Sequence, residues 1–390
     1  MSDARWPRGS IACIVGARPN YMKMAPLVRA FASEPGLPPC VLIHTGQHYD
    51  VAMNERLFRD LELPEPDVNL EVGSGTHAVQ TAEVMRRVEP VLDQMAPACV
   101  VVVGDVNSTL AVGLVAAKKG IPVAHVEAGL RSNDRSMPEE INRVLTDQLA
   151  DLLYTTERSA ADNLAREGIP ASRIHFAGNV MIDSLMRHVA RAIAPASTLG
   201  RATIDPALAA DAAGYAVVTL HRPSNVDDPR ALAEALAILD AVATRMPVIW
   251  PVHPRTLANI ARFGLALEQG GKRIAMLPPQ GYLEMLGLMA GAKVVLTDSG
   301  GLQEETTALA VPCLTMRENT ERPITIEQGT NTLVGRDRAR VLEEVDAIIA
   351  GGGKRGRRPE LWDGQAAPRI ARHLARWLAT RVPPVEVALA

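Results

Sequence analysis

Short apolar runs alternate with longer amphipathic stretches along almost the whole chain, and this alternation constrains the fold more than any other feature. The runs are rich in valine and isoleucine and are apolar at nearly every position. Strands of this kind are buried on both faces, as in parallel sheets that helices cover on either side. The predicted strands are residues 11–15, 41–45, 99–103, 122–126, 152–155, 174–177, 215–220, 248–252, 274–277, 294–297 and 313–316.

The predicted strands fall into two series, which indicates an α/β protein with two Rossmann-like, doubly wound domains that face a cleft. A length of 390 residues also favours two domains, although a single closed barrel remains an alternative. We predict an N-terminal domain over residues 1–190 and a C-terminal domain over residues 191–365, divided in an alanine-rich segment. A final helix at about 366–390 is predicted to pack back on the first domain.

Composition excludes several classes of function. A net charge of −3 argues against nucleic-acid binding. No apolar run is long enough to span a membrane, so we expect a cytoplasmic protein with no membrane partner. The four cysteines have no CxxC spacing, so neither a zinc site nor a redox pair is predicted.

A glycine pair follows the predicted strand 294–297, at the edge where parallel sheets bind ligands. Ser299 is a suitable helix N-cap, and Gly300 and Gly301 would let an anion approach the backbone N–H groups of the helix. One turn further, Glu305 could accept hydrogen bonds from ribose hydroxyls. A tight strand-to-helix turn without a ligand is the alternative.

Cations follow other strands. Arg18 ends the first strand, where a guanidinium can bind a phosphate through two hydrogen bonds, and Lys23 lies one turn further along the same predicted helix. Arg322 lies in a third cationic turn after strand 313–316. The chain contains neither a P-loop nor an intact GxGxxG after a strand, so any phosphates are held in another way.

Ionisable residues also lie at strand ends. Asp105 and Glu127 follow apolar strands, Glu139 lies in the first turn of a predicted helix, and His221 ends a strand. Carboxylates with an imidazole suit proton transfer at carbon or activation of a leaving group. Asp105 and Glu139 could instead cap helices, and His253 could be either structural or catalytic.

With these residues assembled, the chain resembles the non-hydrolysing UDP-N-acetylglucosamine 2-epimerase family from about residue 15 to about residue 335. The matching motifs are Gly16-Ala17-Arg18-Pro19, Lys23-Met24-Ala25-Pro26, Thr45-Gly46-Gln47-His48, Gly104-Asp105, His125-Val126-Glu127-Ala128-Gly129-Leu130-Arg131, Pro138-Glu139-Glu140, Asn142-Arg143, Gly178-Asn179, His221-Arg222, Pro251-Val252-His253, Pro279-Gln280, Thr297-Asp298-Ser299-Gly300-Gly301, Gln303-Glu304-Glu305, Thr320-Glu321-Arg322-Pro323 and Gly329-Thr330-Asn331.

The resemblance implies a glycosyltransferase-B-like fold and reversible epimerisation at C2 of a UDP sugar, without a cofactor or metal. UDP leaves as the C2 proton is lost, and it adds back to a 2-acetamidoglucal after reprotonation on the other face. The resemblance assigns acid–base roles to Asp105, Glu127 and Glu139, and it assigns His221 to the departing diphosphate. The residues implied to bind UDP are Arg18, Lys23, Gln280, Ser299, Gly300, Gly301, Glu305 and Arg322, and those implied for an allosteric site are Gln47, Arg222 and His253.

The resemblance also implies a homodimer that serves cell-surface polysaccharide biosynthesis. Three alternatives remain at this point: a hydrolysing 2-epimerase, a glycosyltransferase of the same architecture and a non-catalytic sensor of nucleotide sugars. The chain departs from common family patterns at several positions, among them Asn20, where many members have glutamate, and Tyr49-Asp50-Val51, in a segment tied to allostery in some bacterial members.

Overall fold

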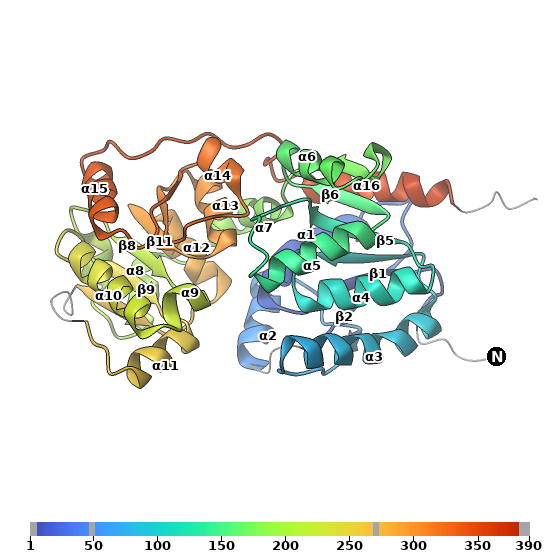
Figure 1. The fold of residues 1–390 in the computed structure, drawn as a ribbon, viewed down its shortest axis with the longest axis horizontal. Coiled ribbons are helices and arrows are strands. Elements are labelled where there is room, and N and C mark those ends of the chain that lie inside the picture. Colours follow the sequence, from blue (N-terminus) through green and yellow to red (C-terminus); the bar gives the residue numbers. More distant parts are fainter. Residues whose placement is uncertain (1–5, 47–50, 268–272, 382–390) are drawn as a thin grey trace, which may run out of the picture. The chain divides into compact units, whose positions relative to one another are not determined.

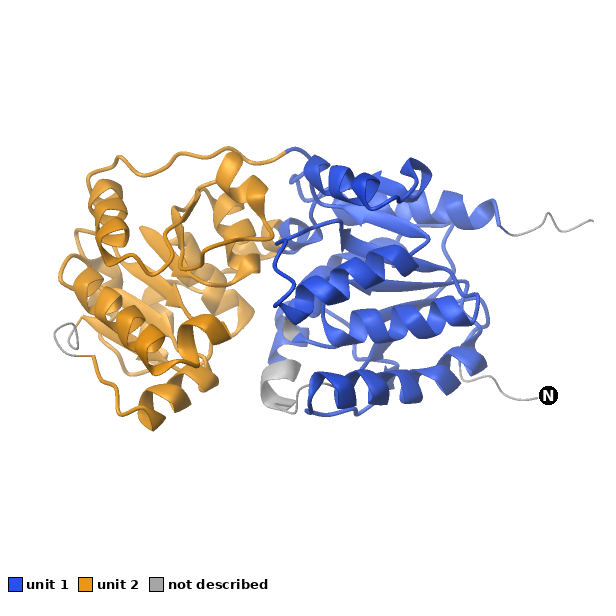
Figure 2. Ribbon diagram, viewed as in Figure 1, with its two compact units in different colours: residues 1–184, 360–390 blue, residues 185–359 orange. Residues whose placement is uncertain are grey.

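The computed structural model describes residues 6–46, 51–267 and 273–381, and for Arg18 and residues 51–55 it describes the backbone only. The chain forms two compact units (Figure 2). Unit 1 comprises Met1–Ser184 together with Glu360–Ala390, and unit 2 comprises Leu185–Pro359.

Unit 1 contains a parallel sheet, in which the described residues form seven strands in the order β3-β2-β1-β4-β5-β6-β7. In this order β1 and β4 lie side by side at the centre, so their carboxyl ends form a topological switch point, where open α/β sheets bind ligands. The strands are β1 (Ile11–Val15), β2 (Cys40–His44), β3 (Val68–Asn69), β4 (Cys99–Val103), β5 (Val123–Ala128), β6 (Leu152–Thr155) and β7 (Ile174–Phe176).

Helices cover both faces of this sheet. In Figure 1, α3, α4 and α5 lie in front of the strands and α1 lies behind them. The helices of unit 1 are α1 (Arg18–Ala32), α2 (Val51–Asp60), α3 (His77–Met95), α4 (Asn107–Lys118), α5 (Pro138–Leu149), α6 (Arg158–Arg166), η1 (Ala171–Arg173) and α16 (Ala366–Ala379), and α7 (Val180–His188) crosses from unit 1 into unit 2.

The end of the chain returns to unit 1, because α16 packs against α1. The Asp183 carboxylate accepts hydrogen bonds from Ala366 N and Ala367 N at 3.1 and 2.7 Å, at the start of α16. Trp362 is fully buried, and its Nε1 donates to Thr156 O at 3.0 Å. The return is therefore held by both apolar burial and specific hydrogen bonds.

Unit 2 repeats the doubly wound arrangement, with six parallel strands among its described residues in the order β10-β9-β8-β11-β12-β13. The strands are β8 (Ala216–Thr219), β9 (Val248–Pro251), β10 (Ile274–Leu277), β11 (Val294–Thr297), β12 (Cys313–Thr315) and β13 (Asn331–Leu333). The helices are η2 (Val189–Arg191), α8 (Pro195–Arg201), η3 (Pro206–Ala210), α9 (Pro223–Val226), α10 (Pro229–Ala243), α11 (Pro254–Arg262), α12 (Tyr282–Ala290), α13 (Gly300–Leu309), α14 (Pro323–Glu327) and α15 (Arg338–Ile349).

All the strands predicted from apolar runs are present, within one or two residues at their ends. Both sheets are open, so the alternative of a closed barrel is wrong. The sequence missed β3 and β13, because each has only two or three residues and both include an asparagine. Within the described chain, no helix is both long and apolar enough to cross a lipid bilayer.

Candidate functional site

The turn between β1 and α1 is fixed by a buried asparagine. Asn20 Oδ1 accepts hydrogen bonds from Gly16 N and Ala17 N at 3.3 and 3.0 Å, and its Nδ2 donates to Val103 O at 2.9 Å. An ionised glutamate could not make the last of these bonds, because a carboxylate has no donor. Asn20 therefore joins the carboxyl ends of β1 and β4.

Two predicted site residues, Lys23 and Glu127, form a buried ion pair at this edge of the sheet. Lys23 Nζ lies 2.6 Å from Glu127 Oε1, and the two residues are only 5% and 4% exposed. Gly104 lies beside them in the left-handed region, with φ +68°, and a Cβ there would be 2.9 Å from Lys23 Nζ. The pair is thus packed against the residue that precedes Asp105.

Glu127 has a strained backbone. Its φ is +74°, and the register between β5 and β6 shifts between Val126 and Ala128. In a regular strand, His125 and Glu127 would point to the same face of the sheet. The irregularity instead directs Glu127 to Lys23 of α1, while His125 contacts Asp147 of α5. Strain of this kind is common at functional sites.

Asp105 is held by an arginine from α5. Arg143 Nη2 lies 2.5 Å from Asp105 Oδ2, and Arg143 Nη1 lies 2.5 Å from Glu140 Oε2. Asn142 Nδ2 donates to Asp105 O at 2.9 Å. The Asp105 side chain is 22% exposed, so it keeps access to solvent or a ligand while its charge is paired.

The first turn of α5 contains two adjacent glutamates with different surroundings. Glu140 is 3% exposed and accepts hydrogen bonds from Ser132 N and Asn133 N at 3.0 and 2.9 Å, so it holds the preceding loop. Glu139 is half-buried in the same turn. The acid–base role that the sequence predicts for Glu139 stays a prediction.

In unit 2, the buried carboxylate of Asp298 organises the turn after β8. It accepts hydrogen bonds from His221 N and Arg222 N, both at 2.9 Å, and from Asn225 Nδ2 at 3.1 Å. The same carboxylate lies 2.8 Å from His221 Nδ1. Burial alone would raise the pKa of Asp298, but the hydrogen bonds from His221 and Arg222 outweigh it and hold the pKa below its usual value. This contact leaves His221 Nε2 available to a ligand.

The helix α13 begins at Gly300, with Ser299 at the N-cap position as the sequence predicts, but the Ser299 side chain makes no capping hydrogen bond there. Backbone N–H groups in the first turn of a helix have no partner within the helix, and they favour anions. A Cβ on Gly300 would overlap with Glu321 Oε1, so a larger residue there would displace the Glu321 carboxylate. Arg322, which is 4% exposed, lies near this turn and pairs with Glu304 of α13 through Nε at 3.0 Å.

Glu305 is a buried carboxyl on the same helix. It is 3% exposed, and its Oε1 completes no hydrogen bond with any of the described residues. Burial raises the pKa of Glu305 to about 8, an effect that the Tyr282 hydroxyl reduces and Glu304 increases. A buried acceptor of this kind is costly unless something binds to it.

The remaining predicted site residues lie in different places. Gln280 precedes α12 and donates to Pro278 O at 2.7 Å. His253 is the N-cap of α11, and its ring centroid is 5.7 Å from that of His221. Arg222 Nη2 lies 3.6 Å from Glu321 Oε1. Gln47 falls outside the described residues, and of Arg18 only the backbone is described, at the start of α1.

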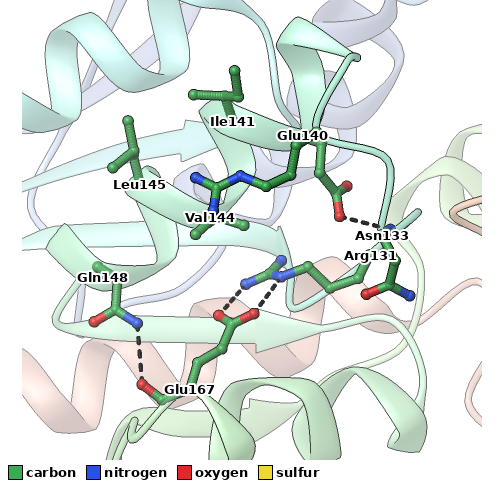
Figure 3. Close-up of a pocket in the computed structure, with 9 residues that line it drawn as sticks. Arg131, Asn133, Glu140, Ile141, Val144, Leu145, Gln148 and Glu167 are labelled. Carbon is green, nitrogen blue, oxygen red and sulfur yellow. Dashed lines mark hydrogen bonds and ion pairs between the residues drawn. The ribbon is translucent and has the colours of Figure 1, made fainter.

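A cavity of about 540 Å³ lies against α5 and contains none of the predicted site residues (Figure 3). Its apolar wall comes from Ile141, Val144 and Leu145. Its polar wall is already paired, because Arg131 donates twice to Glu167, at 2.7 and 2.6 Å. None of Lys23, Asp105 and Glu127 lines this cavity, so it is not the site that the sequence predicts.

Sequence reasoning missed the residues that support the site. They include Arg143, Asp147 and Asp298, which bind Asp105, His125 and His221 respectively. The sequence does contain a signal for Arg143 and Asp147. Together with Glu140 they follow a helical spacing and so share one face of α5, and the buried face of a helix is ordinarily apolar. Charged residues in that position predict paired partners elsewhere in the chain.

The chain is similar to known proteins over most of its length. Residues 33–375 match the family model described as UDP-N-acetylglucosamine 2-epimerase. The UDP-N-acetylglucosamine 2-epimerase of Methanocaldococcus jannaschii is 41% identical over 372 residues, which cover 93% of this chain and 98% of that protein. The UDP-2,3-diacetamido-2,3-dideoxy-D-glucuronate 2-epimerase of Pseudomonas aeruginosa is 40% identical over 379 residues, which cover 94% and 99%.

Solved structures agree with these similarities. The crystal structure of the M. jannaschii UDP-GlcNAc 2-epimerase in complex with UDP-GlcNAc and UDP matches with a TM-score of 0.84 at 38% identity, covering 94% of this chain and 99% of that one. The predicted fold class, two Rossmann-like domains of the glycosyltransferase-B-like kind, is thereby confirmed.

Proposed function

The chain belongs to the UDP-N-acetylglucosamine 2-epimerase family, and we propose that it is an isomerase that interconverts UDP-N-acetylglucosamine and UDP-N-acetylmannosamine. The reaction runs by elimination of UDP, formation of a 2-acetamidoglucal and re-addition of UDP. The observation that supports this most directly is the position of two carboxylates near the ends of adjacent strands. Asp105 follows β4 and pairs with Arg143, and Glu127 lies near the end of β5 and pairs with Lys23.

The proton transfers at C2 are assigned to carboxylates of unit 1. A C2–H is a poor acid, so cleavage of the anomeric C–O bond has to accompany its loss. Inversion then requires a proton donor on the opposite face of C2, and hence more than one acid–base group. Asp105, Glu127 and Glu139 supply this set in the proposal, and Arg143 and Lys23 balance the charges of the first two.

Departure of UDP is assigned to unit 2. The first turn of α13 would bind the diphosphate through N–H groups of Gly300 and Gly301, and Arg322 adds positive charge nearby. His221, oriented by Asp298, would stabilise the leaving oxygen. Glu305 would accept hydrogen bonds from the ribose hydroxyls at its buried Oε1. Arg18, Lys23, Ser299 and Gln280 complete the proposed UDP contacts.

The test is to incubate the protein with UDP-N-acetylglucosamine in D₂O and follow the products by NMR. We expect the manno epimer and deuterium at C2 of the recovered nucleotide sugars, because the C2 proton exchanges with solvent. Turnover without label at C2 would contradict the mechanism. Free sugar and UDP as the main products would show the hydrolysing alternative instead.

The P. aeruginosa relative is as similar to this chain as the archaeal ones are, so UDP-2,3-diacetamido-2,3-dideoxy-D-glucuronate is the second candidate substrate. The same NMR assay with this sugar, at equal concentration, compares the two. A kcat/KM that is higher for the diacetamido sugar by tenfold or more would reassign the substrate while leaving the chemistry unchanged.

We also propose that the protein is a homodimer in the cytoplasm and that its product serves the synthesis of cell-surface polysaccharide. The large apolar side chains Val79, Ile141 and Leu145 on α3 and α5 are 41–56% exposed, which supports an interface on this face of unit 1. Light scattering should give twice the chain mass of 41.8 kDa. Leu145→Glu should yield a monomer, whereas Leu257→Glu, at the 52% exposed Leu257 in unit 2, should leave the mass unchanged.

A further inference from the structure

A buried charge cluster connects the two turns that follow β4 and β5. His125 and Asp147 are both fully buried, and His125 Nδ1 lies 2.7 Å from Asp147 Oδ1. The other ring nitrogen, His125 Nε2, lies 2.8 Å from Gly104 O. Arg131 Nη2 lies 2.7 Å from Asp147 Oδ2 and 2.6 Å from Glu167 Oε2.

The partners of His125 define its hydrogen bonding. Both ring nitrogens face oxygens that can only accept, a carboxylate and a carbonyl, so both bonds are complete when both nitrogens carry hydrogen. In the same cluster, Arg131 pairs with both Asp147 and Glu167. Buried charges are tolerated when they are paired in this way.

The cluster acts on the backbone at two glycines. Gly104 directly precedes Asp105, and its φ is +68°. Its N donates to Val126 O at 3.0 Å and its O accepts from His125 Nε2, so both polar groups of Gly104 are bound to β5. Gly129 follows Glu127 by two residues, has φ +80°, and donates from its N to Asp147 Oδ2 at 3.1 Å.

These contacts act on the backbone beside Asp105 and Glu127, the proposed acid–base groups. Gly104 fixes where Asp105 leaves β4, and Gly129 fixes where the strained Glu127 segment leaves β5. Neither His125 nor Asp147 has exposed surface, so neither can touch a sugar. A displacement of about 1 Å in a catalytic group can reduce turnover by on the order of 100-fold.

We infer that His125 and Asp147 are positioning residues for the reaction, and that the hydrogen bond from His125 Nε2 to Gly104 O sets the position of Asp105. This inference rests on the proposed function. The cluster holds Gly104 and Gly129, the glycines next to Asp105 and close after Glu127, in the left-handed conformation.

The test compares two substitutions at one buried site. His125→Gln places an amide donor near the position of Nε2 and keeps the bond to Gly104 O. His125→Asn places its donor near Nδ1 and loses that bond. We expect kcat to fall on the order of 100-fold in His125→Asn and less than tenfold in His125→Gln, with KM and UDP affinity within threefold of the parent. The kinetic isotope effect of substrate deuterated at C2 should rise in His125→Asn, which a purely structural role would not produce.

Equal losses in the two variants, or losses below threefold in both, would overturn the inference. If His125→Asn does not fold by circular dichroism, Asp147→Asn takes its place beside His125→Gln, because an amide at residue 147 removes one of the two acceptors that serve His125 Nδ1 and Gly129 N. Asp147→Asn should then lower kcat more than tenfold, and a loss below threefold with a normal fold would overturn the inference. Parent turnover is measured first: an inactive parent refutes the proposed function, whereas an active parent with unaffected variants refutes only the positioning role.

Discussion

Asp105→Asn should reduce kcat by on the order of 1,000-fold while UDP affinity stays within twofold of the parent. The amide keeps the size of the carboxylate but neither accepts nor returns a proton at neutral pH. The fold should survive, because Arg143 keeps its contact with Glu140 when Asp105 loses its charge. The measurement is steady-state epimerisation by NMR, together with calorimetric titration of UDP.

The matched control is Asp67→Asn in the same unit. The Asp67 carboxylate accepts a hydrogen bond from Leu42 N at 2.8 Å and lies away from the carboxyl ends of the strands. It should change kcat by less than threefold. If Asp105→Asn kept more than a tenth of parent turnover, Asp105 would have no acid–base role, and the transfer at C2 would fall to Glu127 and Glu139.

Asp298→Asn should lower the free energy of unfolding by about 3 kcal/mol, because a buried carboxylate that accepts hydrogen bonds from two backbone N–H groups and two side chains is replaced by an amide with fewer acceptor sites. Turnover should also fall, since His221 Nδ1 loses the acceptor that orients its ring. Urea denaturation and NMR turnover measure the two effects.

The pH dependence of Asp298 follows from its lowered pKa. A carboxyl whose pKa is lower in the folded than in the unfolded state contributes stability above its unfolded pKa of about 3.9, and this contribution is lost as the pH falls through the folded pKa. The free energy of unfolding of Asp298→Asn should therefore fall less than that of the parent when the pH drops below about 4. Asp211→Asn changes a more exposed carboxylate of the same unit, which accepts hydrogen bonds from Ala213 N and Arg273 Nη2, both at 2.9 Å, and it should lower the free energy of unfolding much less than Asp298→Asn does. Equal losses at both positions would refute the special role of Asp298.

The parallel, doubly wound architecture follows from the sequence pattern without any knowledge of long-range contacts. A strand buried on both faces has to be apolar at nearly every position, and that requirement is local enough to be seen in runs such as those of β1, β4 and β11. The sequence pattern also predicts where the candidate site residues lie, at strand ends and helix starts, because the carboxyl ends of parallel strands share one edge of the sheet. The start of α13 at Gly300 was predicted for the same reason.

Which charged groups pair with one another could be seen only in the three-dimensional structure. Glu139 and Glu140 are equivalent in the sequence, yet one is half-buried and the other is bound to Ser132, Asn133 and Arg143. Lys23 and Glu127 are 104 residues apart, and Asp298 lies 77 residues from His221. Pairings over such separations depend on strand order and on the direction in which each helix presents its side chains, and no local pattern records either.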